Sequence, residues 1–222
     1  MTVVEGVPTR RHPLIRLAYA LARWEIKRVT GKSLLTPDIP LRAHRFRQLV
    51  GYAQLEKSVA RRPLVPERLR ALAVLKSAVM QGCEMCQDIG SFEARAKGTT
   101  EAQLRELHRY ADSEHFDEAE RLVLDLAVAM TRTPVYVPPE LLEALREQLG
   151  SDAALVELVH LIAVENLRSR FNGAFQLGAA GFSEGMACAR LETTGSAPPD
   201  ALAAAARGEA PAGGGDGLAI AS

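Results

Sequence analysis

Residues 66–98 read PERLRALAVLKSAVMQGCEMCQDIGSFEARAKG, and this stretch decides the fold class. The opening Pro-Glu pair is typical of a helix start, because the backbone angle of proline fits the first turn and an acid there interacts favourably with the helix dipole. The apolar residues that follow recur at helical spacing until Gly82, and a second helix is predicted from Cys83 to Lys97. The stretch therefore predicts two consecutive helices joined by a short turn.

The rest of the sequence favours the same kind of structure. Apolar residues recur at helical spacing, and alternating runs of Val, Ile and Thr are missing. Thr100, followed three residues later by Gln103, is typical of a capping box. The sequence therefore predicts an all-α fold. Further helices are predicted over residues 13–30, 40–60, 100–110, 116–130, 139–149 and 153–177.

One folded domain is predicted over residues 13–190. The chain has 222 residues, of which 47% are hydrophobic, which is enough for one sizeable core. Residues 1–12 are short and polar, so we expect a flexible N-terminus. Residues 193–222 consist mostly of Gly, Pro, Ala and Ser, so we expect a disordered tail.

Composition argues against several classes of partner and location. Lys and Arg number 27, as do Asp and Glu, so no surplus of positive charge favours nucleic acid. The apolar stretch 14–24 is interrupted by Arg16 and Arg23 and is shorter than the roughly 20 residues of a membrane span, and no secretory signal follows it. Three cysteines do not form a secreted disulfide framework. We expect a cytoplasmic protein that binds neither nucleic acid nor membrane.

Cys83 and Cys86 are the main candidates for chemistry. At a helix start, unpaired backbone amides and the positive end of the dipole stabilise a thiolate, and a spacing of three places both sulfurs on one face. Such a pair can form and break a disulfide. Zinc binding is less favoured, since no second pair of ligands completes a tetrahedron. We expect no metal and no bound cofactor, and incidental packing of the two cysteines remains an alternative.

The motifs around this pair carry a family resemblance. Residues 68–78 (RLRALAVLKSA), the Gly-Cys-Glu-Met-Cys of residues 82–86 and residues 93–103 (EARAKGTTEAQ) resemble the core of the carboxymuconolactone decarboxylase / alkylhydroperoxidase D (AhpD-like) family. The match is to its subgroup with a Cys-x-x-Cys-x-Asp-Ile-Gly pattern. The downstream Glu-Asn-x-x-x-Arg-Phe-Asn motif of that subgroup is present at residues 165–172.

The resemblance implies an all-helical homo-oligomer, a trimer or a multiple of one, and thiol-based reduction of a peroxide. By position, Cys86 would attack the peroxide oxygen and become a sulfenic acid, and Cys83 would condense with it to form a disulfide. A dithiol protein or a lipoyl group would then reduce the pair again.

The sequence departs from the peroxidase members at their proton relay. The positions of their glutamate and histidine hold Ala71 and Gly90 here. Glu67 lies one turn before Ala71 on the same helix face and is a candidate substitute, although an ordinary first-turn acid is the plainer interpretation. Lys76 is a candidate for stabilising the thiolate, and a lysine whose charged end reaches solvent is the plainer interpretation.

Three functions are therefore open. The first is a thiol oxidoreductase, the second a cofactor-free lyase that grips a small carboxylate with Arg168 or Arg170, and the third a non-enzymatic or redox-sensing oligomer. Glu165, Arg168, Arg170 and Asn172 form a dense polar cluster, for which an ion-pair network, a subunit contact and a site role are alternatives. Trp24 is expected to be a packing residue.

Overall fold

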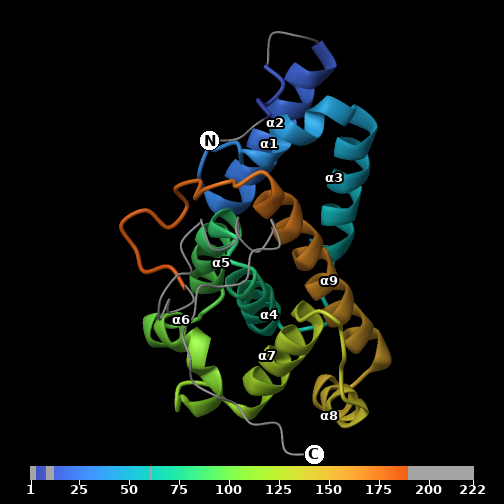
Figure 1. Cartoon of the computed structure of the whole chain (residues 1–222), viewed down its shortest axis with the longest axis vertical. Coiled ribbons are helices and arrows are strands. Elements are labelled where there is room, and N and C mark those ends of the chain that lie inside the picture. The colour runs from blue at the N-terminus through green and yellow to red at the C-terminus, as the bar shows by residue number, and fades with distance from the viewer. Residues whose placement is uncertain (1–3, 9–12, 61, 190–222) are drawn as a thin grey trace, which may run out of the picture. The chain divides into compact units, whose positions relative to one another are not determined.

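The computed structural model describes residues 4–8, 13–60 and 62–189. These residues are helical, with no strand among them, as the sequence predicts. In chain order the elements are α1 (Pro13–Thr30), α2 (Asp38–Arg42), the short 3-10 helix η1 (Ala43–Arg45), α3 (Phe46–Ala60), α4 (Glu67–Met80), α5 (Glu84–Ala96), α6 (Glu101–Glu106), the 3-10 helix η2 (Leu107–Asp112), α7 (Glu118–Thr131), α8 (Pro139–Leu149) and α9 (Asp152–Ala174) (Figure 1).

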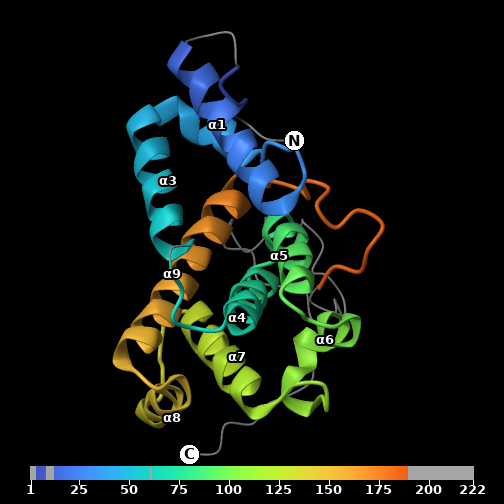
Figure 2. The same ribbon diagram turned by 180° about the vertical axis from the view of Figure 1, so that it is seen from behind.

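Helix α4 is the centre of the fold and packs against α5, α7 and α9 (Figure 2). One side of α4 contributes Leu72 and Leu75 to a core cluster that also holds residues of α5, α6 and η2. The other side contributes Ala73 to a second cluster with α7, α8 and α9. Because both sides are apolar, α4 is buried along most of its length, and the turn at its end is held in a fixed place.

The helix ends follow the sequence closely. Thr100 and Gln103 form the predicted capping box at α6, and Gly150, in a left-handed conformation, ends α8. Three predicted segments differ. The segment predicted as one helix over 40–60 is divided into α2, η1 and α3, and the segment over 100–110 is divided into α6 and η2. The last helix ends at Ala174 rather than near residue 177.

Part of the predicted flexible N-terminus contacts the fold. The Val7 N–H donates to the Pro40 carbonyl at 3.0 Å, and the Tyr19 hydroxyl donates to the Val7 carbonyl at 2.7 Å. Residues 4–8 therefore lie against α2, whereas residues 1–3 and 9–12 are outside the described residues. The predicted disordered tail, residues 193–222, also lies outside them.

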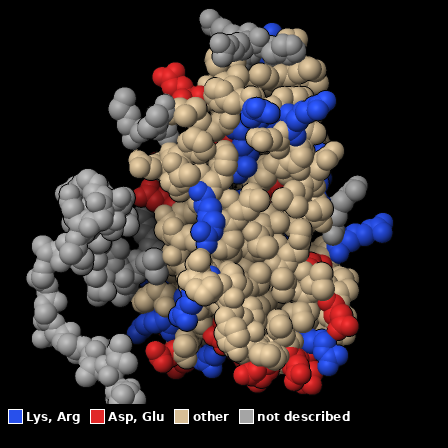
Figure 3. Space-filling view, turned by 45° about the vertical axis from the view of Figure 1, so that its right-hand side comes forward, with Lys and Arg blue, Asp and Glu red and all other residues tan. Residues whose placement is uncertain are grey.

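Trp24 is not the packing residue that the sequence suggested, since its side chain is 60% exposed. It shares one face of α1 with other exposed apolar side chains, Leu14, Leu17 and Leu21. On the face shown in Figure 3 both signs of charge are present, and acidic side chains gather towards the end where α8 lies. Among the described residues no helix is long and apolar enough to cross a membrane.

Candidate redox site

Cys83 lies at the junction of α4 and α5 and takes part in both helix ends. Gly82 adopts a left-handed conformation with φ +64°. The Gly82 N–H donates to the Val79 carbonyl and the Cys83 N–H to the Ala78 carbonyl. These two bonds form a Schellman motif, which pairs carbonyls that a helix end otherwise leaves unsatisfied. Cys83 is also the N-cap of α5, so the predicted placement of the cysteine pair at a helix start is confirmed.

Cys83 and Cys86 form a disulfide, with their Cα atoms 5.2 Å apart. The Cys83 sulfur accepts a hydrogen bond from the Cys86 N–H at 3.2 Å, as the oxygen of an N-cap serine would. The two side chains are 3% and 8% exposed. After reduction, an amide donor and the positive end of the helix dipole stabilise a thiolate in this position. The geometry suits reversible disulfide chemistry in a nearly dry environment.

Asn172, near the end of α9, contacts both sulfurs. Its Nδ2 lies 3.3 Å from the Cys86 sulfur and 3.8 Å from the Cys83 sulfur. The residue is 2% exposed, and its Oδ1 has no hydrogen-bond partner among the described residues. The amide therefore has one end on the sulfurs and one end unpaired, which is uncommon for a buried polar group.

Asp88 fixes the segment that covers the cysteines. The N–H groups of Ala180 and Phe182 donate to its Oδ2, each at 2.9 Å, and the Ser183 N–H donates to its Oδ1 at 2.6 Å. The Ser183 hydroxyl donates to the Asp88 carbonyl at 2.7 Å. The aspartate of the Cys-x-x-Cys-x-Asp pattern is thus an anchor for the loop after α9.

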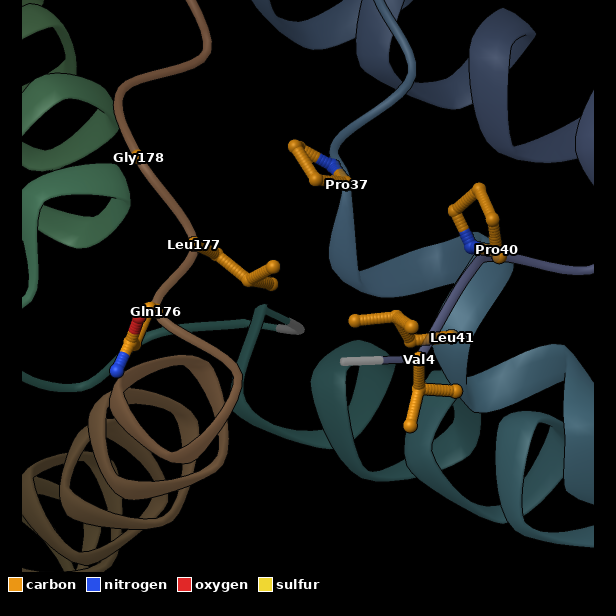
Figure 4. A pocket seen from close by; sticks show the side chains of 8 residues that line it. Val4, Pro37, Pro40, Leu41, Gln176, Leu177 and Gly178 are labelled. Atoms are coloured by element: carbon orange, nitrogen blue, oxygen red, sulfur yellow. The ribbon is translucent and has the colours of Figure 1, made fainter. Parts of the chain in front are cut away.

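A pocket of about 380 Å³ lies against the apolar cluster that contains the cysteine pair, although neither cysteine lines it. Leu41 and Leu177 line it, and both also belong to the apolar cluster that contains the two cysteines. Figure 4 shows Leu177 on one side of the pocket and Val4, Pro40 and Leu41 on the other. The pocket is lined by apolar side chains, glycines and Gln176.

The two positions of the relay are used for packing. Ala71 packs against the core cluster around Leu72. Gly90 lies against α4, where a Cβ atom would be 3.1 Å from Leu75 Cδ1. A histidine at residue 90 would therefore have to displace a fully buried leucine. Small residues at these two positions therefore serve the packing of α4, and Gly90 in particular allows α5 to approach it closely.

Glu67 and Lys76 do not contact the cysteines. The exposed Glu67 carboxylate pairs with Lys97, and the hydrogen bond from Lys97 lowers the pKa of Glu67. The Lys76 ammonium donates to the carbonyls of Leu107 and His108, in and beside the core cluster on the other side of α4. Both candidates are thus placed away from the site, and the plainer interpretation of Glu67 agrees with the structure.

Lys76 also differs from its plainer interpretation, because its head does not reach solvent. The residue is 4% exposed, and its Nζ lies 4.6 Å from the centre of the Tyr110 ring. Burial lowers the pKa of Lys76 to about 8. Lys76 is a buried hydrogen-bond donor that ties α4 to η2.

The cluster at residues 165–172 is mainly an ion-pair network. Arg168 lies 3.1 Å from Glu56 and 3.2 Å from Glu165, and the Ser169 hydroxyl donates to Glu165 at 2.7 Å. Burial raises the pKa of Glu165 to about 7. The charge of Arg168 is thus already balanced, which disfavours its role as a grip for a carboxylate substrate.

Arg170 and Cys188 lie outside the cysteine pair. The exposed Arg170 donates to the Thr133 hydroxyl at 3.2 Å. The Cys188 thiol donates to the Gln87 carbonyl at 3.4 Å and is the free cysteine of the described residues. No group of three or more His, Cys, Asp or Glu side chains in the described ranges is arranged to hold a metal ion.

Comparison with known proteins identifies the family. The model of the carboxymuconolactone decarboxylase family matches residues 47–129. The uncharacterized protein YnjA of Escherichia coli (strain K12) is 34% identical over 182 residues, which cover 78% of this chain and 93% of that protein. This chain belongs to the carboxymuconolactone decarboxylase family. The resemblance seen in the sequence is therefore confirmed.

Solved structures share the fold of this carboxymuconolactone decarboxylase family member. The debrominase Bmp8 has a TM-score of 0.68 and 20% identity, over 82% of this chain and 94% of that one. An AhpD-like protein of unknown function from Agrobacterium tumefaciens has a TM-score of 0.58 and 24% identity, over 63% of this chain and 94% of that one. At these identities the similarity shows a common helical fold.

Sequence reasoning missed two residues of this site. Asn172 was noted only as part of a polar cluster, because nothing in the sequence indicates that α9 brings it to α5. Asp88 was noted only as part of a motif. The motif at residues 165–172 ends on Asn172 and is the one signal that could have drawn attention to it. A sequence motif does not, however, show that this residue contacts the cysteine sulfurs.

Proposed function

We propose that this protein is a thiol-dependent oxidoreductase that reduces a peroxide, or a disulfide, through Cys83 and Cys86. The observation that carries the proposal is the disulfide at the amide-rich start of α5, with Cys83 as the N-cap. Membership of the carboxymuconolactone decarboxylase family and a fold shared with an AhpD-like protein and a debrominase support an enzymatic role.

The proposed reaction uses the two sulfurs in turn. The Cys86 thiolate attacks the terminal oxygen of a hydroperoxide, so that an S–O bond forms, the O–O bond breaks and an alkoxide leaves and takes a proton from water. Cys83 then attacks the sulfenic acid, the S–S bond forms and water is released. Two electrons and two protons from a dithiol protein or a lipoyl group restore the pair. Such donors are kept reduced in the cytoplasm, where we place the protein.

The pocket against the cluster of the two cysteines supports an organic peroxide as substrate. Apart from Gln176 its lining side chains are apolar, and two of them, Leu41 and Leu177, belong to the same apolar cluster as the two cysteines. Val4→Trp would fill part of it without changing the buried cluster, since Val4 is 38% exposed. We expect kcat/KM for cumene hydroperoxide to fall severalfold and kcat/KM for hydrogen peroxide to stay constant. Val135→Trp, at another exposed position, is the matched control.

Kinetics of cysteine variants test the proposal. Cys86→Ser should abolish hydroperoxide reduction, because no attacking sulfur remains. Cys83→Ser should give one equivalent of trapped sulfenic acid and no turnover, because no resolving thiol remains. Cys188→Ser should leave the rate unchanged. Full activity in Cys86→Ser would contradict the proposal, and disulfide formation without catalytic turnover would favour the redox-sensing oligomer instead.

A second candidate uses the same thiols on a halogenated ring. Bmp8, which shares the fold, is a debrominase, and its Cys-to-Ala variant was solved with 2,3,4-tribromopyrrole. The pocket against the apolar cluster of the two cysteines favours such a ligand. Two thiols would supply two electrons, C–Br would become C–H, and bromide would be released with a proton. Bromide release from 2,3,4-tribromopyrrole by the reduced protein tests this candidate, and its absence excludes this substrate.

A further inference from the structure

The unexplained feature of the site is the Asn172 amide. Its Oδ1 is buried and has no hydrogen-bond partner among the described residues. An unpaired buried amide oxygen is costly, because it has lost its hydrogen bonds to water and gained none in the protein. The Nδ2 group of the same amide lies 3.3 Å from the Cys86 sulfur, so the unpaired oxygen belongs to a side chain that already contacts the reacting atom. A group that completes the hydrogen bond would therefore be positioned against Cys86.

Glu84, the first residue of α5, is exposed and has its carboxylate beside Gly178. Three other carboxylates near the site are directed to partners of their own. Asp88 on α5 accepts hydrogen bonds from three backbone amides of the loop after α9, and on α9 Glu165 pairs with Arg168. On α2 Asp38 pairs with Arg42 at 3.1 Å. Within the described part of the chain, the hydrogen-bond donors to the two sulfurs are thus the Cys86 N–H and the Asn172 amide.

We propose that Asn172 is a catalytic residue that holds the thiolate and the peroxide together at a site without the proton relay. Its Nδ2 group stabilises the Cys86 thiolate, and its Oδ1 accepts the hydroxyl hydrogen of the hydroperoxide. This inference rests on the proposed peroxide reduction. A hydrogen bond to a charged sulfur is stronger than one to a disulfide sulfur, so the amide favours the reduced, ionised state.

The Nδ2 and Oδ1 groups of the amide would both assist the formation of the S–O bond. With the hydroxyl hydrogen held by Oδ1, the terminal oxygen of the peroxide lies against the thiolate held by Nδ2. The S–O bond forms as the O–O bond breaks, and the hydroxyl hydrogen stays on that oxygen in the sulfenic acid. The alkoxide that leaves takes its proton from water. Asn172 itself neither gains nor loses a proton.

The first test measures the pKa of Cys86 in a protein that retains no other cysteine. In a Cys83→Ser, Cys188→Ser background, the pH dependence of iodoacetamide alkylation gives the Cys86 pKa. Asn172→Leu removes both polar ends at nearly constant size, and we expect the pKa to rise by about one unit or more. Asn172→Asp keeps the shape and replaces the donor by a carboxylate, and should also raise it.

Asn166→Leu is the matched control, because Asn166 lies on the same helix and donates to Thr131 and Ile162 rather than to sulfur. It should leave the Cys86 pKa unchanged. Circular dichroism and thermal unfolding report whether each variant is folded. An unchanged pKa in folded Asn172→Leu and Asn172→Asp would overturn the donor role.

The second test concerns the free oxygen. In the same background, sulfenic acid formation with cumene hydroperoxide is followed by dimedone trapping, at a pH where Cys86 is fully ionised in every variant. At that pH all variants have the same fraction of thiolate, so any remaining difference in rate reports the contact with the peroxide. We expect Asn172→Leu to react about tenfold more slowly. Equal rates would overturn the substrate contact. If the background protein with an unchanged Asn172 does not react with the peroxide, the proposed function fails. The comparison of Cys86 pKa values still decides the donor role in that case.

Discussion

The roles of Gly90 and Lys76 depend on their contacts and could not be inferred from their residue types alone. Gly90 occupies the relay histidine's position and instead allows α5 to approach Leu75 of α4. Lys76 was expected near the thiolate or in solvent, but its partners, the carbonyls of Leu107 and His108, lie in another helix. Periodicity predicts the face on which a side chain lies. It does not predict which element packs there.

Glu165 provides a prediction at this scale. Burial raises its pKa from the ordinary value of 4.5 to about 7. Between these values the folded protein holds a proton that the unfolded chain has lost, so the free energy of unfolding falls as pH rises through that window. Glu165→Gln keeps a similar shape and does not titrate.

The free energy of unfolding of the unmodified protein, compared with that of Glu165→Gln, should therefore fall by on the order of 2 kcal/mol between about pH 4.5 and pH 7. Urea unfolding of both proteins across this range measures the difference. Parallel stability curves would show that Glu165 titrates in the folded protein as it does in the unfolded chain.

The turn between α4 and α5 is the element on which the site depends. Its glycine and the start of the next helix were predicted from the sequence, because a Schellman motif and an N-cap are local features. Contacts that cross the fold were not predicted. Asp88 binds the amide of Ala180, which is distant in the chain, and Asn172 reaches Cys86 from α9.

Gly82→Ala tests the turn. Gly82 has φ +64° and nothing within 4 Å of an added Cβ, so the cost is that of the left-handed backbone alone. We expect a loss of about 1–2 kcal/mol in the free energy of unfolding. Gly51→Ala is the control, since Gly51 lies inside α3 with the same open space. It should stabilise the protein by about 0.5–1 kcal/mol. A neutral Gly82→Ala would argue against this account of the turn.

For the whole molecule, the all-α class and most helix boundaries were predicted because helical periodicity and caps are written locally in the sequence. The packing order was not, since nothing local states that α4 lies between α5, α7 and α9. The expected burial of Trp24 failed for the same reason. A tryptophan on an amphipathic helix indicates an apolar face, and the described residues leave that face of α1 exposed.

Self-association is the prediction at this scale. The face of α1 with Leu14, Leu17, Leu21 and Trp24 is 53–60% exposed, and we expect a second copy to cover it in a homo-oligomer. Leu17→Glu combined with Leu21→Glu should shift the sedimenting mass to that of a monomer. Val135→Glu, at an exposed apolar position elsewhere, should leave it unchanged. A double variant that sediments as the unmodified protein would exclude this face as the interface.

The central claim is that Cys83 and Cys86 cycle between dithiol and disulfide at the start of α5. The direct measurement is a titration of free thiols in the reduced protein before and after one equivalent of cumene hydroperoxide, with mass spectrometry of the products. The account predicts the loss of two thiols, an intramolecular Cys83–Cys86 bond, an intact Cys188 thiol, and full recovery with a dithiol. Unchanged thiols, or oxidation confined to Cys188, would contradict it.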